Sequence, residues 1–133
     1  MGDTVANGAV TGGVRTVLRL EGLTLFLGMV MLYGVWGASW WFFALFFLAP
    51  DLSFIAYLAG AKTGAVVYNA AHSYMLAVAL IILSPAIPEP HTLSIAMIWL
   101  AHIGIDRALG YGLKYEAGFG FTHLGSIGRN KGT

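Results

Sequence analysis

Long apolar stretches alternate with short polar or glycine-rich breaks along most of the chain. Four of these stretches lie at about residues 17–37, 39–59, 64–84 and 92–115. Each is close to the length of about 20 residues that a helix rising 1.5 Å per residue needs to cross about 30 Å of hydrocarbon. The pattern therefore predicts an all-α integral membrane protein, a bundle of four transmembrane helices.

Proline marks two interruptions in this pattern. Pro50 falls inside the second stretch, in "APD", where it removes a backbone donor and predicts a broken helix with Asp51 at the start of the second half. The prolines of "PAIPEP", residues 85–90, predict a rigid turn after the third stretch. The predicted domains are a disordered N-terminal segment at 1–14, a transmembrane domain at 15–115 and a glycine-rich tail at 116–133.

The composition agrees with a membrane location and excludes several kinds of site. Of the 133 residues, 58% are hydrophobic and 10% are charged, and the mean hydropathy is +0.76. A soluble domain has about 25% charged residues. The absence of cysteine excludes disulfides, thiolate metal ligands and cysteine nucleophiles. A net charge of +1 gives no reason to expect a nucleic-acid partner.

Six of the seven lysines and arginines flank the predicted spans on one side of the bundle. They are Arg15, Arg19, Lys62, Lys114, Arg129 and Lys131. The loops on the other side, around Ala38 and Glu89, have neither residue type. By the positive-inside rule, both chain termini are expected to be cytoplasmic, and the protein to be a multi-pass protein of the cytoplasmic membrane.

Four ionisable side chains share a common depth in the cytoplasmic half of this bundle. Counted from the cytoplasmic ends at 1.5 Å per residue, they lie in a band roughly 10–17 Å deep. They are Asp51, His72, His102 and Asp106. His102 and Asp106 are four residues apart and so share one helix face. An unpaired ionisable group at this depth costs at least about 2.5–3.5 kcal/mol, so we expect the four to face one another.

Several interpretations of this band remain open from the residues alone. In the first, the four side chains bind a divalent metal such as zinc, iron or manganese. In the second, they belong to a structural network in which Arg107 pairs with Asp106 or Glu21 and each histidine donates to a carbonyl. A haem bridged by His72 and His102 is a less favoured third interpretation.

Further polar residues near the band are candidates for chemistry on a substrate. With a metal present, Glu21 or Asp51 would act as general base, and Arg107 or Lys114 would bind an anionic group. The predicted substrate contacts are Tyr68, Asn69, Tyr111 and Lys114.

Some histidines and glycines have simpler predicted roles. His91 and His123 lie in predicted loops, where we expect them to be solvated. Five glycines are expected to permit close helix packing, as small residues do in membranes. They are Gly60, Gly64, Gly104, Gly110 and Gly112.

Five blocks of the sequence occur together in a known family. They are "LRLEGL", "PDLSFIAYLAG", "GAVVYNAAHSY", "HIGIDRALGYGLKY" and "GFGFTHLGSIGR". With these blocks, which cover nearly all of residues 15–129, the sequence resembles the small bacterial integral membrane proteins of domain-of-unknown-function family 4260. This resemblance implies a four-span protein of the bacterial inner membrane, and it implies no particular activity.

A lesser resemblance is to membrane-bound metal-dependent hydrolases. Their pattern has a Pro-Asp, then a His-Ser, then a later His followed by Asp. The corresponding residues here are Pro50-Asp51, His72-Ser73, and His102 with Asp106. This resemblance implies metal-dependent hydrolysis.

Three functions are compatible with the sequence. The first is an intramembrane metal site, open to the cytoplasm, that hydrolyses a lipid-like or anionic substrate by lowering the pKa of a bound water. The second is a small oligomeric transporter or proton-coupled carrier in which the same side chains relay protons. The third is a membrane scaffold subunit whose polar network only fixes packing. The predicted partners are the lipid bilayer and further copies of the same chain.

Overall fold

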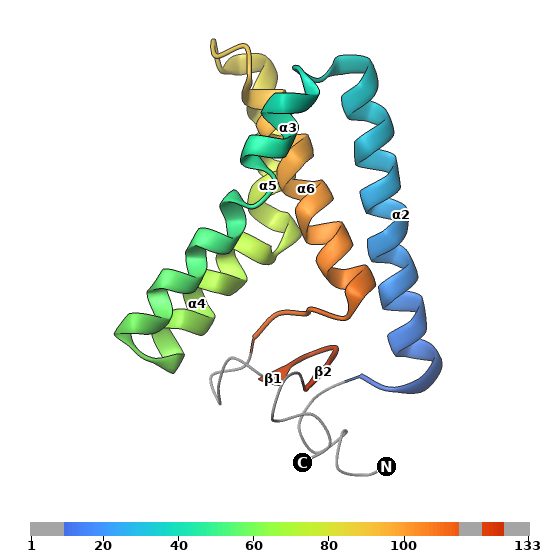
Figure 1. Cartoon of the computed structure of the whole chain (residues 1–133), viewed down its shortest axis with the longest axis vertical. Helices are drawn as coiled ribbons and strands as arrows, with labels where there is room; N and C mark the ends of the chain where they lie inside the picture. The colour runs from blue at the N-terminus through green and yellow to red at the C-terminus, as the bar shows by residue number, and fades with distance from the viewer. Residues whose placement is uncertain (1–9, 115–120, 127–133) are drawn as a thin grey trace.

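The computed structural model describes residues 10–114 and 121–126, most of them in helices (Figure 1). The helices are α2 (Gly12–Trp36), α3 (Trp40–Phe46), the 3₁₀ helix η1 (Ala49–Ala59), α4 (Ala61–His72), α5 (Tyr74–Leu83), the 3₁₀ helix η2 (Ser84–Ala86) and α6 (Thr92–Leu109). Three helical stretches are long and apolar enough to cross a membrane: α2, α3 together with η1, and α6. α4 and α5 make a fourth if they are taken together across their bend. The fold therefore agrees with an all-α membrane protein.

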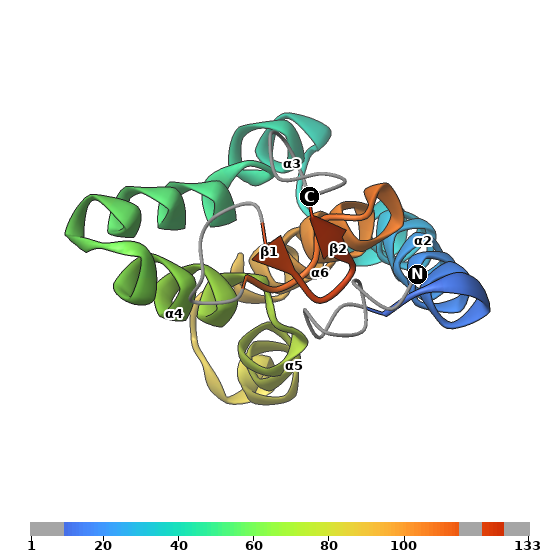
Figure 2. The same ribbon diagram turned by 90° about the horizontal axis from the view of Figure 1, so that it is seen from below.

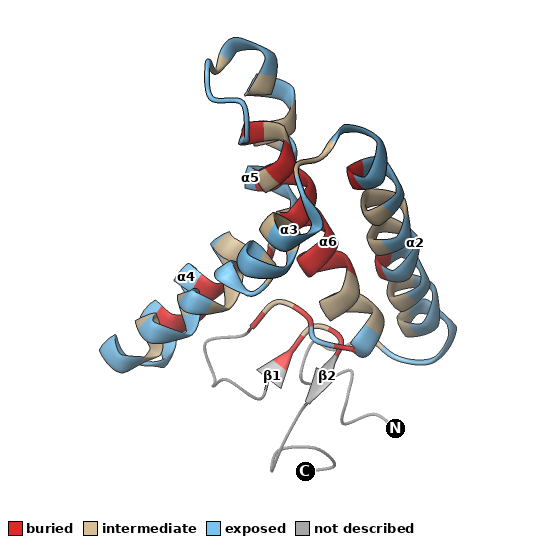
Figure 3. Ribbon diagram, turned by 45° about the horizontal axis from the view of Figure 1, so that its top comes forward, coloured by how far each residue is buried: buried red, intermediate tan, exposed pale blue. Residues whose placement is uncertain are grey.

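α6 is the central helix and carries many of the buried residues (Figure 3). It packs along α2 on one side, and seen from below it lies between α2 and the hairpin of η1 and α4 (Figure 2). Ile98 of α6 belongs to a buried cluster with Tyr33 of α2, and Ile103 belongs to a second cluster with Ala77 of α5. Inside a bilayer, close packing of such side chains holds helices together, because lipid tails are as apolar as the side chains.

α2 and α6 come into close contact at two glycines. A Cβ atom at Gly22 would lie 2.5 Å from the Cβ of Arg107 and 2.7 Å from the carbonyl oxygen of Gly104. A Cβ atom at Gly104 would lie 2.7 Å from the carbonyl oxygen of Gly22. Both positions therefore need a residue without a side chain. The predicted packing role is confirmed for Gly104, and Gly22 is its unpredicted partner.

η1 and α4 form a hairpin that leans away from the α2–α6 pair (Figure 1, Figure 2). Two turn residues separate α3 from η1, and Pro50 lies at the start of η1. The turn of the hairpin falls at Gly60, whose φ of +117° is a conformation that favours glycine. Gly64 of α4 packs directly against the ring of Tyr57. η1 has no buried residue, so this arm is largely exposed to its surroundings.

The third predicted span is bent where a straight helix was expected. α4 and α5 meet at an angle of 40° across Ser73, whose backbone is extended, with φ −93° and ψ 156°. An extended residue interrupts the helical hydrogen bonds and leaves carbonyl groups at the end of α4 for other donors. The carbonyl of His72 accepts a hydrogen bond from the Arg107 guanidinium at 3.0 Å. That of Ala71 accepts one from the indole of Trp99 at 2.6 Å.

The outer ends of the transmembrane domain also differ from the predicted ones. α2 begins at Gly12, so the last residues of the predicted disordered segment are helical, while residues 1–9 lie outside the described part of the chain. α6 ends at Leu109 and does not reach residue 115. The cause is Gly110, whose φ of +93° ends the helix and whose N–H bonds to the carbonyl of Arg107.

The segment after α6 folds back over the ends of α2 and α6. It contains the antiparallel strands β1 (Phe121–Thr122) and β2 (Gly125–Ser126). Leu124, between the strands, is buried, and its carbonyl accepts a hydrogen bond from Nε of Arg15 at 2.6 Å. The described part of the predicted tail is therefore packed against the helices. Residues 115–120 and 127–133 lie outside the described part.

Candidate metal centre

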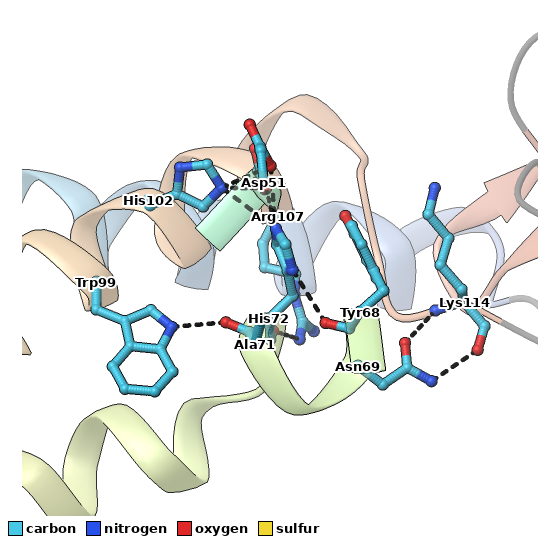
Figure 4. A network of polar contacts seen from close by, with 10 residues as sticks. Asp51, Tyr68, Asn69, Ala71, His72, Trp99, His102, Arg107 and Lys114 are labelled. Carbon is cyan, nitrogen blue, oxygen red and sulfur yellow. Dashed lines mark hydrogen bonds and ion pairs between the residues drawn. The ribbon is translucent and has the colours of Figure 1, made fainter. Parts of the chain in front are cut away.

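Four side chains from three helices converge on one point (Figure 4). Asp51 comes from η1, His72 from α4, and His102 and Asp106 from successive turns of α6. One possible ligand atom from each side chain lies within 4.8 Å of those of the other three. These four residues, here called the ligand cluster, are the ones expected to face one another because of their common depth.

The distances within the ligand cluster suit a single divalent ion. Nε2 of His102 lies 3.1 Å from Oδ1 of Asp51 and 3.1 Å from Oδ2 of Asp106. Nε2 of His72 lies 3.2 Å from the same Asp51 oxygen and 3.5 Å from the same Asp106 oxygen. Ligand atoms bound at about 2.1 Å to a tetrahedral ion are about 3.4 Å apart. Small shifts of these side chains would therefore complete a coordination sphere.

The same distances disfavour haem. The Nε2 atoms of His72 and His102 are 3.2 Å apart. A bis-histidine haem places the iron and its porphyrin plane between the two nitrogens, and this gap has no room for them.

His72 is held in the orientation of a metal ligand. Its Nδ1 lies 3.0 Å from the carbonyl oxygen of Tyr68, an acceptor, so Nδ1 carries a proton and Nε2 is the nitrogen that faces the cluster. The ring of Tyr68 stacks on the imidazole, with centroids 3.8 Å apart and an angle of 10° between the planes. Metal-bound histidines usually donate their second N–H to a carbonyl or carboxylate in this way, which fixes the tautomer.

His102 is positioned by packing on one side and by the carboxylates on the other. Its Nδ1 is buried and has no hydrogen-bond partner among the described residues. The edge of its ring meets Phe47, with centroids 5.4 Å apart at an angle of 67°. Its Nε2 lies 3.1 Å from Asp51 and 3.1 Å from Asp106, so the ring faces the cluster through this nitrogen.

The carboxylates of the ligand cluster face the two imidazoles. Nε2 of each histidine lies within 3.5 Å of a carboxylate oxygen of both Asp51 and Asp106. Arg107 directs its guanidinium to other groups and makes no ion pair with Asp106 or Glu21, so this feature of the predicted structural network is not found among the described residues. Two carboxylates and two imidazoles that face one another have the composition of a metal site.

Access to the ligand cluster differs from residue to residue. The side chains of His72 and His102 are 3% and 2% exposed, whereas those of Asp106 and Asp51 are 17% and 33% exposed. Asp51 therefore lies at the exposed edge of the cluster, here called the open edge, and the two histidines lie on its buried side.

Arg107 joins the bend between α4 and α5 to the tail. Besides its bond to the His72 carbonyl, it lies over the ring of Tyr74, with 5.1 Å between Cζ and the ring centroid. Its Nη1 lies 3.1 Å from Nε2 of His123. Nδ1 of that histidine accepts a hydrogen bond from the N–H of Leu113 at 2.9 Å. Burial and the nearby guanidinium lower the pKa of His123.

The position of His123 corrects a prediction. It was expected to be solvated in a loop, but it is partly buried beside Arg107. The only signal in the sequence is a histidine within a short segment, "FTHLG", which does not indicate that the segment folds back on α6.

Two further predicted residues, Asn69 and Lys114, connect α4 to the tail. The side-chain amide of Asn69 donates to the carbonyl of Lys114 at 2.8 Å and accepts from its N–H at 2.6 Å. Nζ of Lys114 lies 5.0 Å from the ring centroid of Tyr68. Burial lowers the pKa of Lys114 to about 8, although the charge of Asp106 opposes the shift. Asn69 therefore anchors the backbone of the tail, and Lys114 and Tyr68 lie beside the cluster.

Two candidates from the sequence, Glu21 and Tyr111, lie apart from the ligand cluster, as does His91. Glu21 is exposed and borders a shallow hollow formed by residues of α2 itself. Tyr111 is 43% exposed, beyond the end of α6. His91 is exposed as predicted, and its ring Nδ1 lies 2.9 Å from the Glu89 carboxylate. Hydrogen bonds from the backbone N–H and ring of His91 lower the pKa of Glu89.

Comparison with known proteins gives a family and no activity. The family described as Domain of unknown function (DUF4260) matches residues 15–127, most of the chain. No curated protein and no solved structure matches it.

Proposed function

The chain belongs to the DUF4260 family, and we propose that it is a membrane-embedded, metal-dependent hydrolase. One observation carries the proposal: two carboxylates and two imidazoles, brought from three helices, converge within 4.8 Å. Zinc, iron and manganese are the candidate ions, because each accepts both imidazole and carboxylate ligands.

We place the chain in the bacterial inner membrane as four spans. They are α2, α3 with η1, α4 with α5, and α6. Pro50 breaks the second span and Ser73 bends the third, and each residue is next to a member of the ligand cluster. Irregular backbone at membrane depth is tolerated where it lines a protein site. Both termini are cytoplasmic in this arrangement, because the basic residues Arg15, Lys62 and Lys114 then lie on the cytoplasmic side.

The proposed reaction is hydrolysis of an ester or phosphoester of a lipid-like or anionic substrate. A metal ion held by the ligand cluster would supply a water of lowered pKa. Asp51, on the open edge, would accept a proton from that water, and Glu21 is a more distant second candidate for this role. Hydrolysis would join the water oxygen to the carbonyl carbon or phosphorus, break the bond to the leaving alcohol oxygen, and pass the proton to that alcohol.

Residues on the cytoplasmic side of the cluster would bind the anionic part of the substrate. Arg107 and Lys114 supply positive charge there: Arg107 bonds to the carbonyl of His72, and Nζ of Lys114 lies 5.0 Å from the ring centroid of Tyr68. Asn69 contributes indirectly, because it fixes the backbone that carries Lys114.

Metal content is the direct test. The full chain, purified in detergent without chelator or an affinity-tag metal, is analysed by elemental mass spectrometry beside His72→Ala and His102→Ala. We expect one divalent metal per chain in the wild type and loss of that metal in both variants. The matched control is His91→Ala, which removes an exposed histidine and should keep the metal.

Two results would overturn the proposal. The first is a wild-type protein without metal after incubation with zinc, iron(II) and manganese(II) salts. The second is metal that survives both cluster substitutions. Proton-linked flux in metal-free proteoliposomes would then favour the carrier function, in which the same four side chains relay protons.

A further inference from the structure

An apolar pocket of about 230 Å³ lies directly beside the ligand cluster. It is half open, and residues of α3, η1, α4 and α6 line it. They are Phe46, Ala49, Pro50, Ala71, Ile95, Ile98 and Trp99. The first question is what relation this pocket has to the metal centre.

The pocket and the cluster share their walls. Pro50 and Ala71, which line the pocket, immediately precede the cluster residues Asp51 and His72 in the chain. On α6, Ile95 precedes His102 by seven residues, which is about 10 Å along the helix axis. With the proposed cytoplasmic termini, the pocket therefore extends from the cluster through the middle of the membrane toward its outer half.

The walls of the pocket offer nothing to a polar ligand. Its lining has no charged residue. Its prominent polar groups bond to each other, since the indole N–H of Trp99 donates to the carbonyl of Ala71 at 2.6 Å. A surface of this kind stabilises hydrocarbon and penalises any polar group that enters without a partner.

The opposite side of the cluster has the reverse character. Arg107 and Lys114 lie there, toward the tail. Polarity thus changes across the site, from hydrocarbon walls through the metal ligands to cationic side chains. An amphiphile whose anionic end points to the cytoplasm would match all three zones at once.

The size of the pocket indicates how much of a ligand it holds. Pockets that enclose a whole drug-sized ligand have roughly 300–1,000 Å³. The volume here is smaller, which suits one hydrocarbon chain and not a double-chain lipid or a helix from another protein. The half-open side gives such a chain a route from the surrounding bilayer.

We infer that this pocket is the binding site for the single hydrocarbon chain of an amphiphilic substrate whose anionic end reaches the ligand cluster. The inference rests on the proposed metal-dependent function for the identity of the reacting site. It goes beyond that function by assigning residues to chain recognition. Ile95 and Ala49 are the positions where a larger side chain would shorten the chain that fits.

The test uses photolabelling, which needs no knowledge of the natural substrate. The probe is dodecyl phosphate with a diazirine near the end of its chain, added to the metal-loaded full-length protein in one detergent. Cross-linked peptides are mapped by mass spectrometry, and unlabelled butyl, octyl and dodecyl phosphate compete. We expect labels on the residues that line the pocket.

Filling the pocket should abolish chain selectivity. In the wild type, dodecyl phosphate should compete at a concentration at least about tenfold below that of butyl phosphate, since every additional methylene buried in the pocket favours binding. In Ile95→Trp, the advantage of the long chain should fall to about threefold or less, with unchanged metal content. Because every variant is compared in the same detergent, partitioning of the probe cancels.

The controls separate a chain site from general lipid contact. Ile82→Trp makes the same change on the exposed surface of α5, at a side chain that is 70% exposed, and should leave labelling and selectivity as in the wild type. Ala49→Leu fills the pocket from η1 and should reproduce Ile95→Trp if the latter fails to fold. Labels spread over the lipid-facing surface, or selectivity unchanged in both pocket variants, would overturn the inference.

Failure of the proposed function has a different signature. If the wild type binds no metal and the pocket is still labelled selectively, the chain site stands and the proposed metal-dependent hydrolase does not. If the metal is present but the pocket is not labelled, the chain site is wrong and the metal centre stands.

Discussion

α6 and the η1–α4 hairpin each contribute two members of the ligand cluster, but their surroundings are very different. In the apolar segment of α6, 56% of the residues are buried inside the protein. In the corresponding segment of α3 and η1, none of the residues is buried. α6 packs on α2 through two glycines and on α5 through a buried cluster. The hairpin leans outward, and η1 packs mainly on α4.

This difference shows how the metal centre is assembled. His102 and Asp106 stand on a helix that is fixed from several sides, so their positions are set before any ion binds. Asp51 and His72 stand on a hairpin that leans outward, and the rest of the fold holds it mainly by hydrogen bonds to α4, at Asn69, Ala71 and His72. A bound ion would therefore link the well-packed α6, the fixed half of the site, to the outward-leaning hairpin, the movable half. Its removal should increase the motion of the hairpin more than that of α6.

Removal of the metal should give the largest effect. An ion at about 100 times its dissociation constant stabilises the bound form by about 2.7 kcal/mol. Chelation should therefore speed amide hydrogen exchange in Ala49–Ala59 and Ala61–His72 by up to about 100-fold, with little change in the middle of α6. Exchange mass spectrometry with and without chelator measures this. Equal acceleration in both halves would contradict the comparison.

A methyl group at the α2–α6 contact should give the next largest effect. Gly22→Ala places a Cβ atom against backbone atoms, which should destabilise the protein by about 1–3 kcal/mol. Thermal unfolding in detergent, followed by circular dichroism, measures the change. The matched control is Gly28→Ala on the same helix, where a Cβ atom meets nothing within 4 Å. If α6 is the fixed half, Gly22→Ala should also weaken metal binding without touching a ligand.

Loss of the Asn69 amide should loosen the link between the hairpin and the tail. Asn69→Ala removes two hydrogen bonds to the backbone of Lys114, each contributing about 1 kcal/mol, and exchange of the Lys114 amide should rise accordingly. Asn69→Asp keeps the acceptor and loses the donor, so it should lie between the wild type and Asn69→Ala. If the Lys114 amide exchanges as fast in Asn69→Asp as in Asn69→Ala, the side-chain acceptor at residue 69 contributes nothing.

The smallest effect concerns the pH dependence set by Lys114. Burial lowers its pKa from 10.5 in the unfolded chain to about 8 in the folded one, so folding disfavours the protonated amine. The cost is fully present below about pH 8 and is relieved as the pH rises toward 10.5. Unfolding midpoints across this range should rise in the wild type and flatten in Lys114→Met. Lys62→Met, which alters an exposed lysine, controls for the loss of one charge.

Depth along the apolar stretches was enough to predict the ligand cluster. Counting from the ends of the spans put Asp51, His72, His102 and Asp106 at one level, and the structure brings these four together. The four side chains meet because unpaired ionisable groups are costly in a bilayer. The count itself was only approximate, since Asp51 lies on a 3₁₀ helix and α6 ends at Leu109. The predicted roles of these residues in binding a metal and in catalysis stay predictions.

Contacts that depend on the path of the chain could not be predicted in the same way. The bend at Ser73 arises in a continuous apolar stretch, where one serine gives little indication of an extended residue. His123 reaches Arg107 only because the tail turns back over α6. The absence of an ion pair between Arg107 and Asp106 follows from competition by the His72 carbonyl, which the bend makes available.

The division of the cluster between the hairpin and α6 also has a consequence for how the protein is made. Synthesis and membrane insertion run from the N-terminus, so Asp51 and His72 enter the bilayer 51 and 30 residues ahead of His102. Until the last helix is inserted, the partners of the His72 imidazole all come from the hairpin itself, namely the Asp51 carboxylate and the carbonyl and ring of Tyr68. The final span therefore completes the packing of α2 and α5 and the coordination of the ion in a single late step, and a chain truncated before it would have no binding site to load.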